Sequence, residues 1–352
     1  MRYDVAIVGA GPIGIELAAA LKKADLSYVH FEAGQIGSTL LWWPPQTRFF
    51  SSPERISIAG VPLLTVDQSK ATREEYLTYL RSVVQQFDLK IHTFEKVVGA
   101  EPSEGGYEIL SRHRGGERRT RARRLVLAIG DMHEPNRLHI PGEDADHVSH
   151  YLGETHRYFR QRLLIVGGKN SAVEAAIRCS RAGAHVTLSY RGSEIDPNRV
   201  KYWLMPEIRA LIREGQIRFL PATVPREILG DRVVLERLPD GAAGAASRPG
   251  EPLEVAADFV LLLTGYRQDP TLFERLGVLL EGPGRQPHHD PETMETNVPG
   301  IFVAGTAAAG TQLGGVKAFI ETSHIHVERI VAGLAGRDPR QELEKHYELP
   351  ES

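Results

Sequence analysis

Two glycine-containing stretches carry the residue types and the spacing that bind the phosphates of a dinucleotide. The first stretch reads Gly9-Ala10-Gly11-Pro12-Ile13-Gly14. Its first glycine makes a tight turn, its second lets the backbone approach a pyrophosphate, and its third lets a helix pack on a strand. The amides at the helix N-terminus then face the negative charge. We therefore expect this stretch to hold the pyrophosphate of a nucleotide cofactor.

An acidic residue follows the first stretch at the distance that a nucleotide site requires. Glu32 ends a β-rich segment 23 residues after Gly9, where its carboxylate can bind both hydroxyls of an adenosine ribose. Glycine turns are common, so the turn by itself is weak evidence. The flanking strand patterns and Glu32 together favour a cofactor site over a turn with a purely structural role.

The second stretch reads Gly167-Gly168-Lys169-Asn170-Ser171-Ala172 and has a lysine at the place of the middle glycine. The two glycines that remain still allow the turn, and the lysine adds positive charge near a phosphate. Arg191 stands where the first copy has its acid, and an arginine can stack on adenine and pair with a 2′-phosphate. We expect NADP(H) here in preference to NAD(H). The alternatives are a surface arginine at a strand end and a strand and helix that bind nothing.

Cys179 is the only cysteine of the chain, which excludes dithiol–disulfide exchange through two cysteines of the same chain. It lies in the helix predicted after the second turn, on a face of small residues that would pack on a sheet. We predict that it is a buried structural thiol and not a nucleophile.

Three histidines are weak candidates for a proton donor to a reduced acceptor, His150, His156 and His324, and His326 on the last predicted helix is open to the same role. Each is more readily explained as a surface residue or a hydrogen-bonded core residue, so the catalytic residue stays unknown. The pair His288-His289 precedes Asp290, but these ligands are adjacent and no Cys or His cluster supports them. We predict a loop there and no metal site.

The elements that position these residues form an internal repeat. Each copy reads as an apolar strand, a glycine turn, an amphipathic helix and a second β-rich strand, which spans residues 28–32 in the first copy and 185–190 in the second. Each copy is thus a βαβ unit. Two such units indicate two doubly wound α/β domains.

The order of the remaining segments predicts that one domain is inserted into the other. Residues 1–143 and 266–352 would form a discontinuous FAD-binding domain, and residues 144–265 an NAD(P)H-binding domain. The predicted fold class is α/β, with two Rossmann-like dinucleotide-binding domains of the three-layer ββα type.

Three motifs together resemble the flavoprotein pyridine-nucleotide-disulphide oxidoreductases of the low-molecular-weight thioredoxin reductase type. They are "GAGPIG…FEAG", "VGGKNSAVEAA…YRG" and "TNVPGIFVAGT". The bacillithiol disulfide reductase-like branch is indicated by "WPPQTRFFSSPERISIAGVP", "YRGSEIDPNRVKYWLMPEIRALIREGQI" and "ETMETNVPGIFVAGT". The resemblance covers nearly the whole chain. It implies FAD on the first motif, NADPH on the second, and a homodimer.

The site residues follow from the motifs and from this resemblance. The FAD candidates are Gly9, Gly11, Pro12, Ile13, Gly14, Glu32, Ala33, Gly130, Gly305 and Thr306. The NADPH candidates are Gly167, Gly168, Lys169, Asn170, Ser171 and Arg191. The resemblance also places the aromatic residues Trp42, Trp43, Phe49 and Phe50 near the isoalloxazine, where they can shield the flavin or form the acceptor pocket; core packing is an equal alternative for Phe49 and Phe50.

The chain departs from the family at three positions. The family's strand-end aspartate, which binds the ribityl chain of FAD, is replaced by Thr306, whose hydroxyl can still bind a ribityl oxygen. Thioredoxin reductases carry Cys-x-x-Cys where this chain reads His150-Tyr151-Leu152-Gly153. Bacillithiol disulfide reductases carry a proposed cysteine where this chain has Ile13. Electrons would therefore pass directly from the flavin to an external acceptor.

Four functions remain open on this reasoning. The first is an oxidoreductase that passes hydride from NADPH to FAD and then electrons to a small disulfide or another low-molecular-weight acceptor. The second is a reductase of a ferredoxin- or flavodoxin-like protein, which needs no cysteine. A flavin monooxygenase and a flavin-binding sensor without turnover are further alternatives.

Composition excludes some partners. The chain has 352 residues, 41% of them hydrophobic and 25% charged, with a formal net charge of -3, which gives no reason to expect nucleic acid or an anionic membrane. The basic run from Arg112 to Arg124 is better explained as a solvated hairpin than as a binding patch. The opening "MRYDVAIVGAG" has an apolar run too short for a signal peptide, so we expect a cytoplasmic protein.

Overall fold

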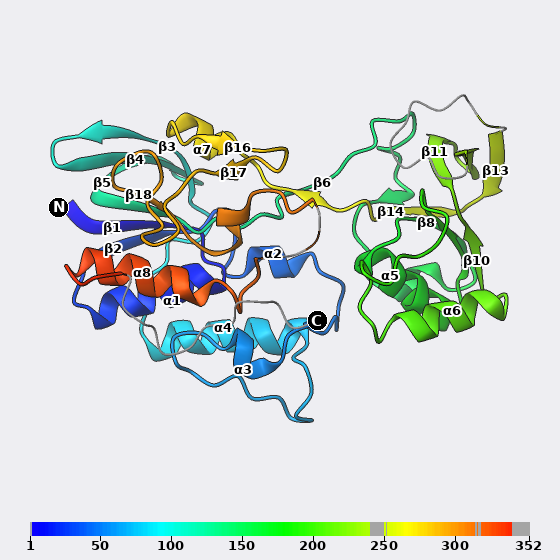
Figure 1. Cartoon of the computed structure of the whole chain (residues 1–352), viewed down its shortest axis with the longest axis horizontal. Coiled ribbons are helices and arrows are strands. Elements are labelled where there is room, and N and C mark those ends of the chain that lie inside the picture. The colour runs from blue at the N-terminus through cyan, green and yellow to red at the C-terminus, as the bar shows by residue number, and fades with distance from the viewer. Residues whose placement is uncertain (1, 240–249, 251, 314, 316–317, 340–352) are drawn as a thin grey trace. The chain divides into compact units, whose positions relative to one another are not determined.

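The computed structural model describes residues 2–239, 250, 252–313, 315 and 318–339, and the chain divides into two compact units (Figure 1). The first unit contains the chain up to Trp42, Gln46–Glu134 and the chain from Tyr266 onward. The second unit contains Trp43–Pro45 and Pro135–Gly265. Each unit has its own sheet and its own core.

The first unit is built on a six-stranded sheet in which four parallel strands lie next to one another. Its strands are β1 (Arg2–Val8), β2 (Tyr28–Phe31), β3 (Lys96–Ser103), β4 (Gly106–His113), β5 (Gly116–Leu127) and β18 (Ile301–Val303). β1 pairs in parallel with β2 and with β5, and β18 pairs in parallel with the end of β5. The apolar run of β1 is fully buried, as expected for a central parallel strand covered on both faces.

Helices and short strands complete the first unit. They are α1 (Pro12–Lys23), α2 (Ser38–Leu41), α3 (Pro53–Ile56), α4 (Arg73–Gln86), α7 (Thr271–Arg275), α8 (His324–Leu334), the 3-10 helix η2 (Gly305–Ala309), β16 (Leu280–Glu281) and β17 (Gln286–Pro287). α1 buries its apolar face from Ile13 to Leu21, and α8 packs beside it (Figure 1). The strands β6 (Glu134–Pro135) and β15 (Tyr266–Arg267) pair with each other where the chain leaves and re-enters this unit.

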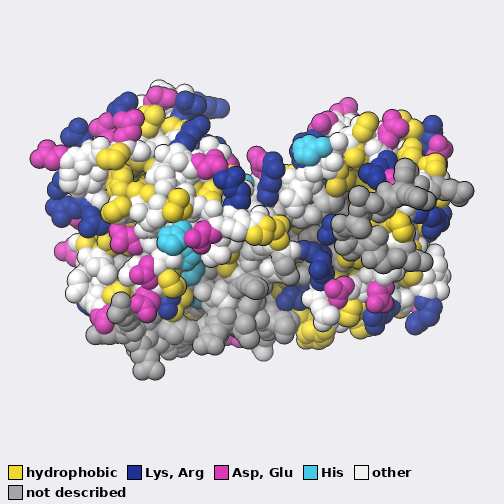
Figure 2. All heavy atoms as spheres, turned by 45° about the horizontal axis from the view of Figure 1, so that its top comes forward, with side chains coloured by type: hydrophobic (Ala, Val, Ile, Leu, Met, Phe, Trp, Pro, Cys, Tyr) yellow, Lys and Arg dark blue, Asp and Glu magenta, His cyan; other side chains and the backbone are white. Residues whose placement is uncertain are grey.

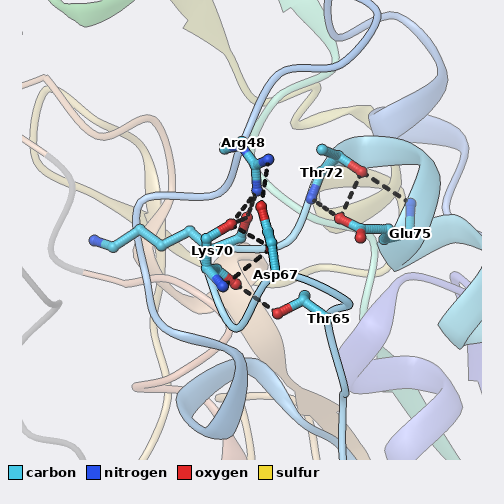
Figure 3. A network of polar contacts seen from close by, with 7 residues as sticks. Arg48, Thr65, Asp67, Lys70, Thr72 and Glu75 are labelled. Atoms are coloured by element: carbon cyan, nitrogen blue, oxygen red, sulfur yellow. Dashed lines mark hydrogen bonds and ion pairs between the residues drawn. The ribbon is translucent and has the colours of Figure 1, made fainter.

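The segment between α3 and α4 is held by polar contacts (Figure 3). Arg48 binds the carboxylate of Asp67 at 3.0 Å and the carbonyl of Lys70 at 2.5 Å. α4 then begins with a capping box, in which the Thr72 side chain accepts a hydrogen bond from the amide of Glu75 and the Glu75 carboxylate accepts one from the amide of Thr72. These contacts hold the segment and the start of α4 in place.

The second unit has three layers around a five-stranded parallel sheet. The sheet contains β7 (Val148–Ser149), β8 (Arg162–Val166), β9 (His185–Ser189), β10 (Ile217–Leu220) and β14 (Phe259–Leu262), in the order β10-β9-β8-β14-β7. On one face lie α5 (Asn170–Arg181) and α6 (Met205–Arg213), with the 3-10 helix η1 (Thr155–Tyr158) nearby. On the other lies an antiparallel sheet of β11 (Thr223–Ile228), β12 (Arg232–Arg237) and β13 (Pro252–Ala256).

The α/β fold with parallel sheets is confirmed, and both predicted βαβ repeats are present as β1-α1-β2 and β8-α5-β9. Acidic and basic side chains are interspersed over the face of the molecule that Figure 2 shows. In the part of the chain that the structure describes, no helix is long and apolar enough to cross a membrane.

Candidate functional site

The first glycine turn follows β1 and leaves no room for side chains at two of its glycines. Gly9 has φ +102°, and a Cβ there would lie 2.4 Å from the carbonyl oxygen of Ala128. A Cβ on Gly14 would lie 2.0 Å from the carbonyl oxygen of Gly9. Each position therefore requires glycine, the first for the backbone turn and the last because α1 packs directly on it.

The middle glycine of this turn faces open space. A Cβ on Gly11 would have no atom within 4 Å, and Gly11 is the N-cap of α1 without a side-chain cap. Pro12 begins the helix, where its missing N–H costs no hydrogen bond. The positive end of the helix dipole thus meets a space next to bare backbone, which is what a pyrophosphate needs.

Glu32 holds its carboxylate against the turn. Oε2 accepts a hydrogen bond from the amide of Ala10 at 2.7 Å, and Oε1 accepts from the amide of Gly34 at 2.7 Å and from the hydroxyl of Ser38 at 3.1 Å. A carboxylate has about four acceptor positions, so these three donors leave one for a ribose hydroxyl. The neighbouring Ala33 is exposed. Gly34 and Ser38 were not predicted from the sequence.

His30 also supports the first glycine turn, and the sequence did not predict it as a site residue. Its Nε2 lies 2.9 Å from the carbonyl oxygen of Gly9, so the ring donates its proton there. Burial lowers the pKa of His30 to about 4, which keeps the ring neutral. A histidine in an apolar strand pattern was the only sequence signal for this role.

Residues that follow β5 and β18 meet at the same edge of the sheet. Because these two strands are parallel neighbours, Gly130 and Gly305 follow their ends side by side. Gln268 joins them, since its Nε2 donates to the carbonyl of Gly130 at 2.9 Å and to that of Ala307 at 3.0 Å. Gly305 has φ +70°, and a Cβ there would lie 3.3 Å from Ile13 Cβ, so this edge also reaches the first turn.

Two titratable residues lie at this edge: Asp131, which the sequence reasoning missed, and His326, which it named only as a possible proton donor. Asp131 accepts a hydrogen bond from Gln312 Nε2 at 2.9 Å and shares one with Thr306. Burial raises the pKa of Asp131, and the bonds to Gln312 and Thr306 oppose that rise. His326 accepts a hydrogen bond from the amide of Gly305 at 3.1 Å, and burial lowers its pKa to about 3.

The three histidine candidates are in separate surroundings. His324 lies 2.8 Å from the Glu16 carboxylate through Nδ1 and 3.0 Å from the carbonyl of Arg55 through Nε2, so it ties α8 to α1 and α3. His150 lies 3.4 Å from Glu143, and burial lowers its pKa. His156 is exposed on η1 and stacks on Phe159. None of these contacts identifies a proton donor.

The second turn accommodates its lysine. Gly167 has φ +148°, and a Cβ there would lie 2.5 Å from the carbonyl oxygen of Leu263; a Cβ on Gly168 would lie 2.3 Å from the ring of Tyr190. Lys169 instead has φ -106°, an extended backbone that any residue adopts, and is the N-cap of α5. The two retained glycines are the ones that the turn requires.

A cluster of three positive side chains includes Lys169, the N-cap of α5. Burial lowers the pKa of Lys169, and the charges of Arg199 and Arg191 lower it further, so the three cations repel one another electrostatically. Asn170, the first helical residue, accepts a hydrogen bond from the amide of Lys201 at 2.8 Å, and Ser171 is exposed. Arg199, which the prediction missed, follows Arg191 in a loop where no periodic pattern marked it.

Cys179 and the aromatic residues have clear surroundings. Cys179 is fully buried in the core under α5, and burial raises its pKa to about 12, so the predicted buried thiol is confirmed. Phe49 is buried against Tyr76, with ring centroids 4.5 Å apart, which is core packing. The ring centroids of Trp42 and Tyr266 lie 4.7 Å apart. Among the described residues no group of three or more His, Cys, Asp or Glu side chains is arranged to hold a metal.

Residues 6–305 match the family of pyridine nucleotide-disulphide oxidoreductases. The chain belongs to this family. It is 33% identical to bacilliredoxin reductase Bdr of Bacillus subtilis, over 94% of this chain and 97% of that one. It is 28% identical to a ferredoxin–NADP reductase of Ignicoccus hospitalis, over 86% of this chain and 89% of that one.

A solved structure supports the same relationship. The bacillithiol disulfide reductase Bdr of Bacillus cereus superimposes with a TM-score of 0.87 at 32% identity, over 96% of this chain and 99% of that one. The protein is thus an NAD(P)H-dependent flavoprotein oxidoreductase related to Bdr. This oxidoreductase has one cysteine and so no Cys-x-x-Cys pair.

Proposed function

We propose that this oxidoreductase passes electrons from NADPH through FAD directly to an external acceptor, without a protein thiol. The observation that supports this most strongly is the state of its only cysteine. Cys179 is fully buried, and its pKa is raised to about 12, so it is a thiol at neutral pH and has no second cysteine to form a disulfide.

We assign FAD to the first glycine turn and to the sheet edge beside it. Glu32 would bind the adenosine ribose, and the backbone from Gly11 to Gly14 would bind the pyrophosphate. Gly130, Gly305 and Thr306 would line the path toward the ring. When bound, FAD would supply an acceptor for hydride and a donor of electrons. The proposed FAD-binding domain spans residues 1–143 and 266–352.

We assign NADPH to the second turn, in a domain proposed to span residues 144–265. The start of α5 and Lys169 would attract the pyrophosphate, and the cluster with Arg191 and Arg199 offers the charge that a 2′-phosphate requires. NADP⁺ should therefore bind more tightly than NAD⁺, a difference that calorimetry with the two oxidised nucleotides measures directly. A homodimer is part of this proposal, and sedimentation velocity tests it.

The proposed acceptor is a small disulfide or another low-molecular-weight compound. The relatives from two Bacillus species carry names that refer to bacilliredoxin and to bacillithiol disulfide, which favours a disulfide. Reduction of a disulfide consumes two electrons and two protons, so one NADPH and one proton yield NADP⁺ and two thiols. The protein itself needs to supply only a binding place near the flavin.

A ferredoxin- or flavodoxin-type acceptor is the second candidate. The relative from Ignicoccus hospitalis is named a ferredoxin–NADP reductase and covers most of the chain. Transfer of single electrons to a protein partner requires no cysteine, which agrees with the buried Cys179.

Anaerobic titration of the FAD-loaded protein with NADPH tests the proposal. The flavin absorbance near 450 nm should bleach with one equivalent of NADPH, whereas a flavin that stays oxidised would refute every reductase function. The bleached protein is then mixed with a low-molecular-weight disulfide, with oxidised ferredoxin or with oxygen. The oxidant that restores the colour fastest identifies the acceptor class, and preference for oxygen alone would favour a monooxygenase.

A further inference from the structure

Asp131 is a partly buried acid at the sheet edge to which we assign FAD. It comes directly after Gly130, four residues beyond the end of β5. Its side chain takes part in two hydrogen bonds, one from Gln312 Nε2 at 2.9 Å and one with the hydroxyl of Thr306. The strand-end prediction named Gly130 and Thr306 but not this carboxylate.

The orientation of Asp131 is fixed by Gln312, a residue from a distant segment that is itself held by two hydrogen bonds. Gln312 donates from Nε2 to the carbonyl of Ala318 at 2.9 Å, and its Oε1 accepts from the amide of Ala318 at 2.9 Å. The amide group of Gln312 is therefore held at both ends, and its Nε2 is aimed at Asp131 Oδ2. Gln312 acts as a positioning residue for the acid.

The place of Asp131 along the sheet edge indicates which part of a dinucleotide it meets. β5 lies between β1 and β18, since Leu127 pairs with Val8 on one side and with Val303 on the other. The glycine turn after β1 takes the pyrophosphate. The next groups along this edge are Asp131 after β5 and Thr306 after β18.

The carboxylate of Asp131 restricts which part of FAD can lie next to it. A carboxylate is an acceptor, and it repels a pyrophosphate. The part of FAD that follows the pyrophosphate is the ribityl chain, whose hydroxyls are donors. About four acceptor positions are present on the carboxylate, and the bonds to Gln312 and Thr306 leave room for a ribityl hydroxyl.

We propose that Asp131 binds a ribityl hydroxyl of FAD, together with Thr306, and so supplies from the β5 end the acid that is missing after β18. This inference rests on the proposed FAD site. It makes Asp131 and Thr306 one hydrogen-bonded pair that contacts the cofactor, with the acid and the hydroxyl on adjacent strands.

Binding of FAD to the protein freed of flavin tests this inference through fluorescence quenching, without any measurement of activity. Asp131→Asn should raise the dissociation constant for FAD about tenfold or more, because a hydrogen bond to a charged group is lost. Asp25→Asn, an exposed acid just after α1, is the matched control and should leave the constant unchanged. Moving the acid with Asp131→Asn plus Thr306→Asp should recover affinity.

FAD analogues that each lack one ribityl hydroxyl complete the test. The wild type should lose affinity for one of these analogues, and Asp131→Asn should show no further loss with that analogue. A wild type that binds FAD and all the analogues equally would overturn the inference, and this result does not depend on how well the variant folds. Equal FAD binding by wild type and Asp131→Asn would also overturn it, while a wild type that does not bind FAD would overturn the proposed function itself.

Discussion

Glu32 receives hydrogen bonds from Ala10, Gly34 and Ser38 on its two carboxylate oxygens, so it serves the structure of the turn before any ligand is present. Glu32→Gln replaces one acceptor oxygen with an NH₂ group that faces a backbone donor. Because the side chain is 6% exposed, we expect the free energy of unfolding to fall by about 1–3 kcal/mol in urea denaturation of the flavin-free protein. The exposed Glu104→Gln is the control, and equal stability of both variants would contradict this role.

Cys179 should be dispensable for turnover. Cys179→Ala removes a buried sulfur from the core under α5, so we expect a loss of about 1 kcal/mol in stability and NADPH-dependent acceptor reduction within twofold of the wild type. A disulfide reagent such as dithiobis(nitrobenzoate) should not react with the native protein, because Cys179 is buried and the pKa of its thiol is raised to about 12. Loss of acceptor reduction in a folded Cys179→Ala variant would refute the thiol-free mechanism.

The pKa values of two histidines on α8 are shifted in opposite directions. Burial lowers the pKa of His324, but the bonded Glu16 carboxylate and the Arg55 carbonyl raise it by more, and both ring nitrogens face acceptors. The pKa of His326 is lowered by burial to about 3. His324 therefore stabilises the fold below about pH 6.5 and loses this contribution as pH rises through its folded pKa. The contribution of His326 is present above about pH 6.5 and is lost as pH falls toward 3.

Imidazole NMR titration and urea denaturation measure these shifts. We expect the pKa of the His324 ring to lie above 6.5. The His326 ring should stay neutral at every pH at which the protein is folded. The stability of His324→Gln, relative to wild type, should be lowest near pH 6 and approach the wild type near pH 9. A stability difference that does not change with pH would contradict the assigned protonation of His324.

At the scale of elements, the capping box at the start of α4 provides a separate test (Figure 3). Thr72→Ala removes the side chain that accepts from the amide of Glu75, and we expect a loss of about 1 kcal/mol in thermal or urea unfolding. Thr78→Ala, an exposed position on the same helix, is the control and should be neutral or slightly stabilising. An equal effect of both variants would show that the cap contributes nothing.

The elements that sequence patterns predict well here are those whose signals are local. The strands and helices around the two glycine turns follow from apolar periodicity and from the glycines that the turns require. Gln312 and Asp131 are 181 residues apart, and no local pattern joins them. His30 reads as an ordinary buried strand residue, and Arg199 as an ordinary loop residue. Their roles depend on which strands become neighbours, which only tertiary pairing decides.

At the scale of the whole molecule, the two units should respond to different cofactors. Hydrogen exchange with mass spectrometry should show FAD protecting peptides from residues 9–14 and 28–38, because Glu32 and the first turn lie there. NADP⁺ should protect peptides from residues 167–172 and 190–199, around Lys169 and Arg191. Protection of the first set by NADP⁺ alone would contradict the assignment of the two turns.

The pairing of β6 with β15 has a consequence for how such a protein can be rebuilt. The amide of His133 donates to the carbonyl of Arg267 at 3.0 Å in the first unit, and the amide of Asn136 donates to the carbonyl of Gly265 at 2.9 Å in the second. In each unit, the two positions at which the chain crosses to the other unit therefore lie next to each other. We expect that a short peptide bridge between these two positions would close either unit into an uninterrupted chain. If NADPH binds the second unit, as proposed, replacing that unit should transfer the nucleotide preference with it.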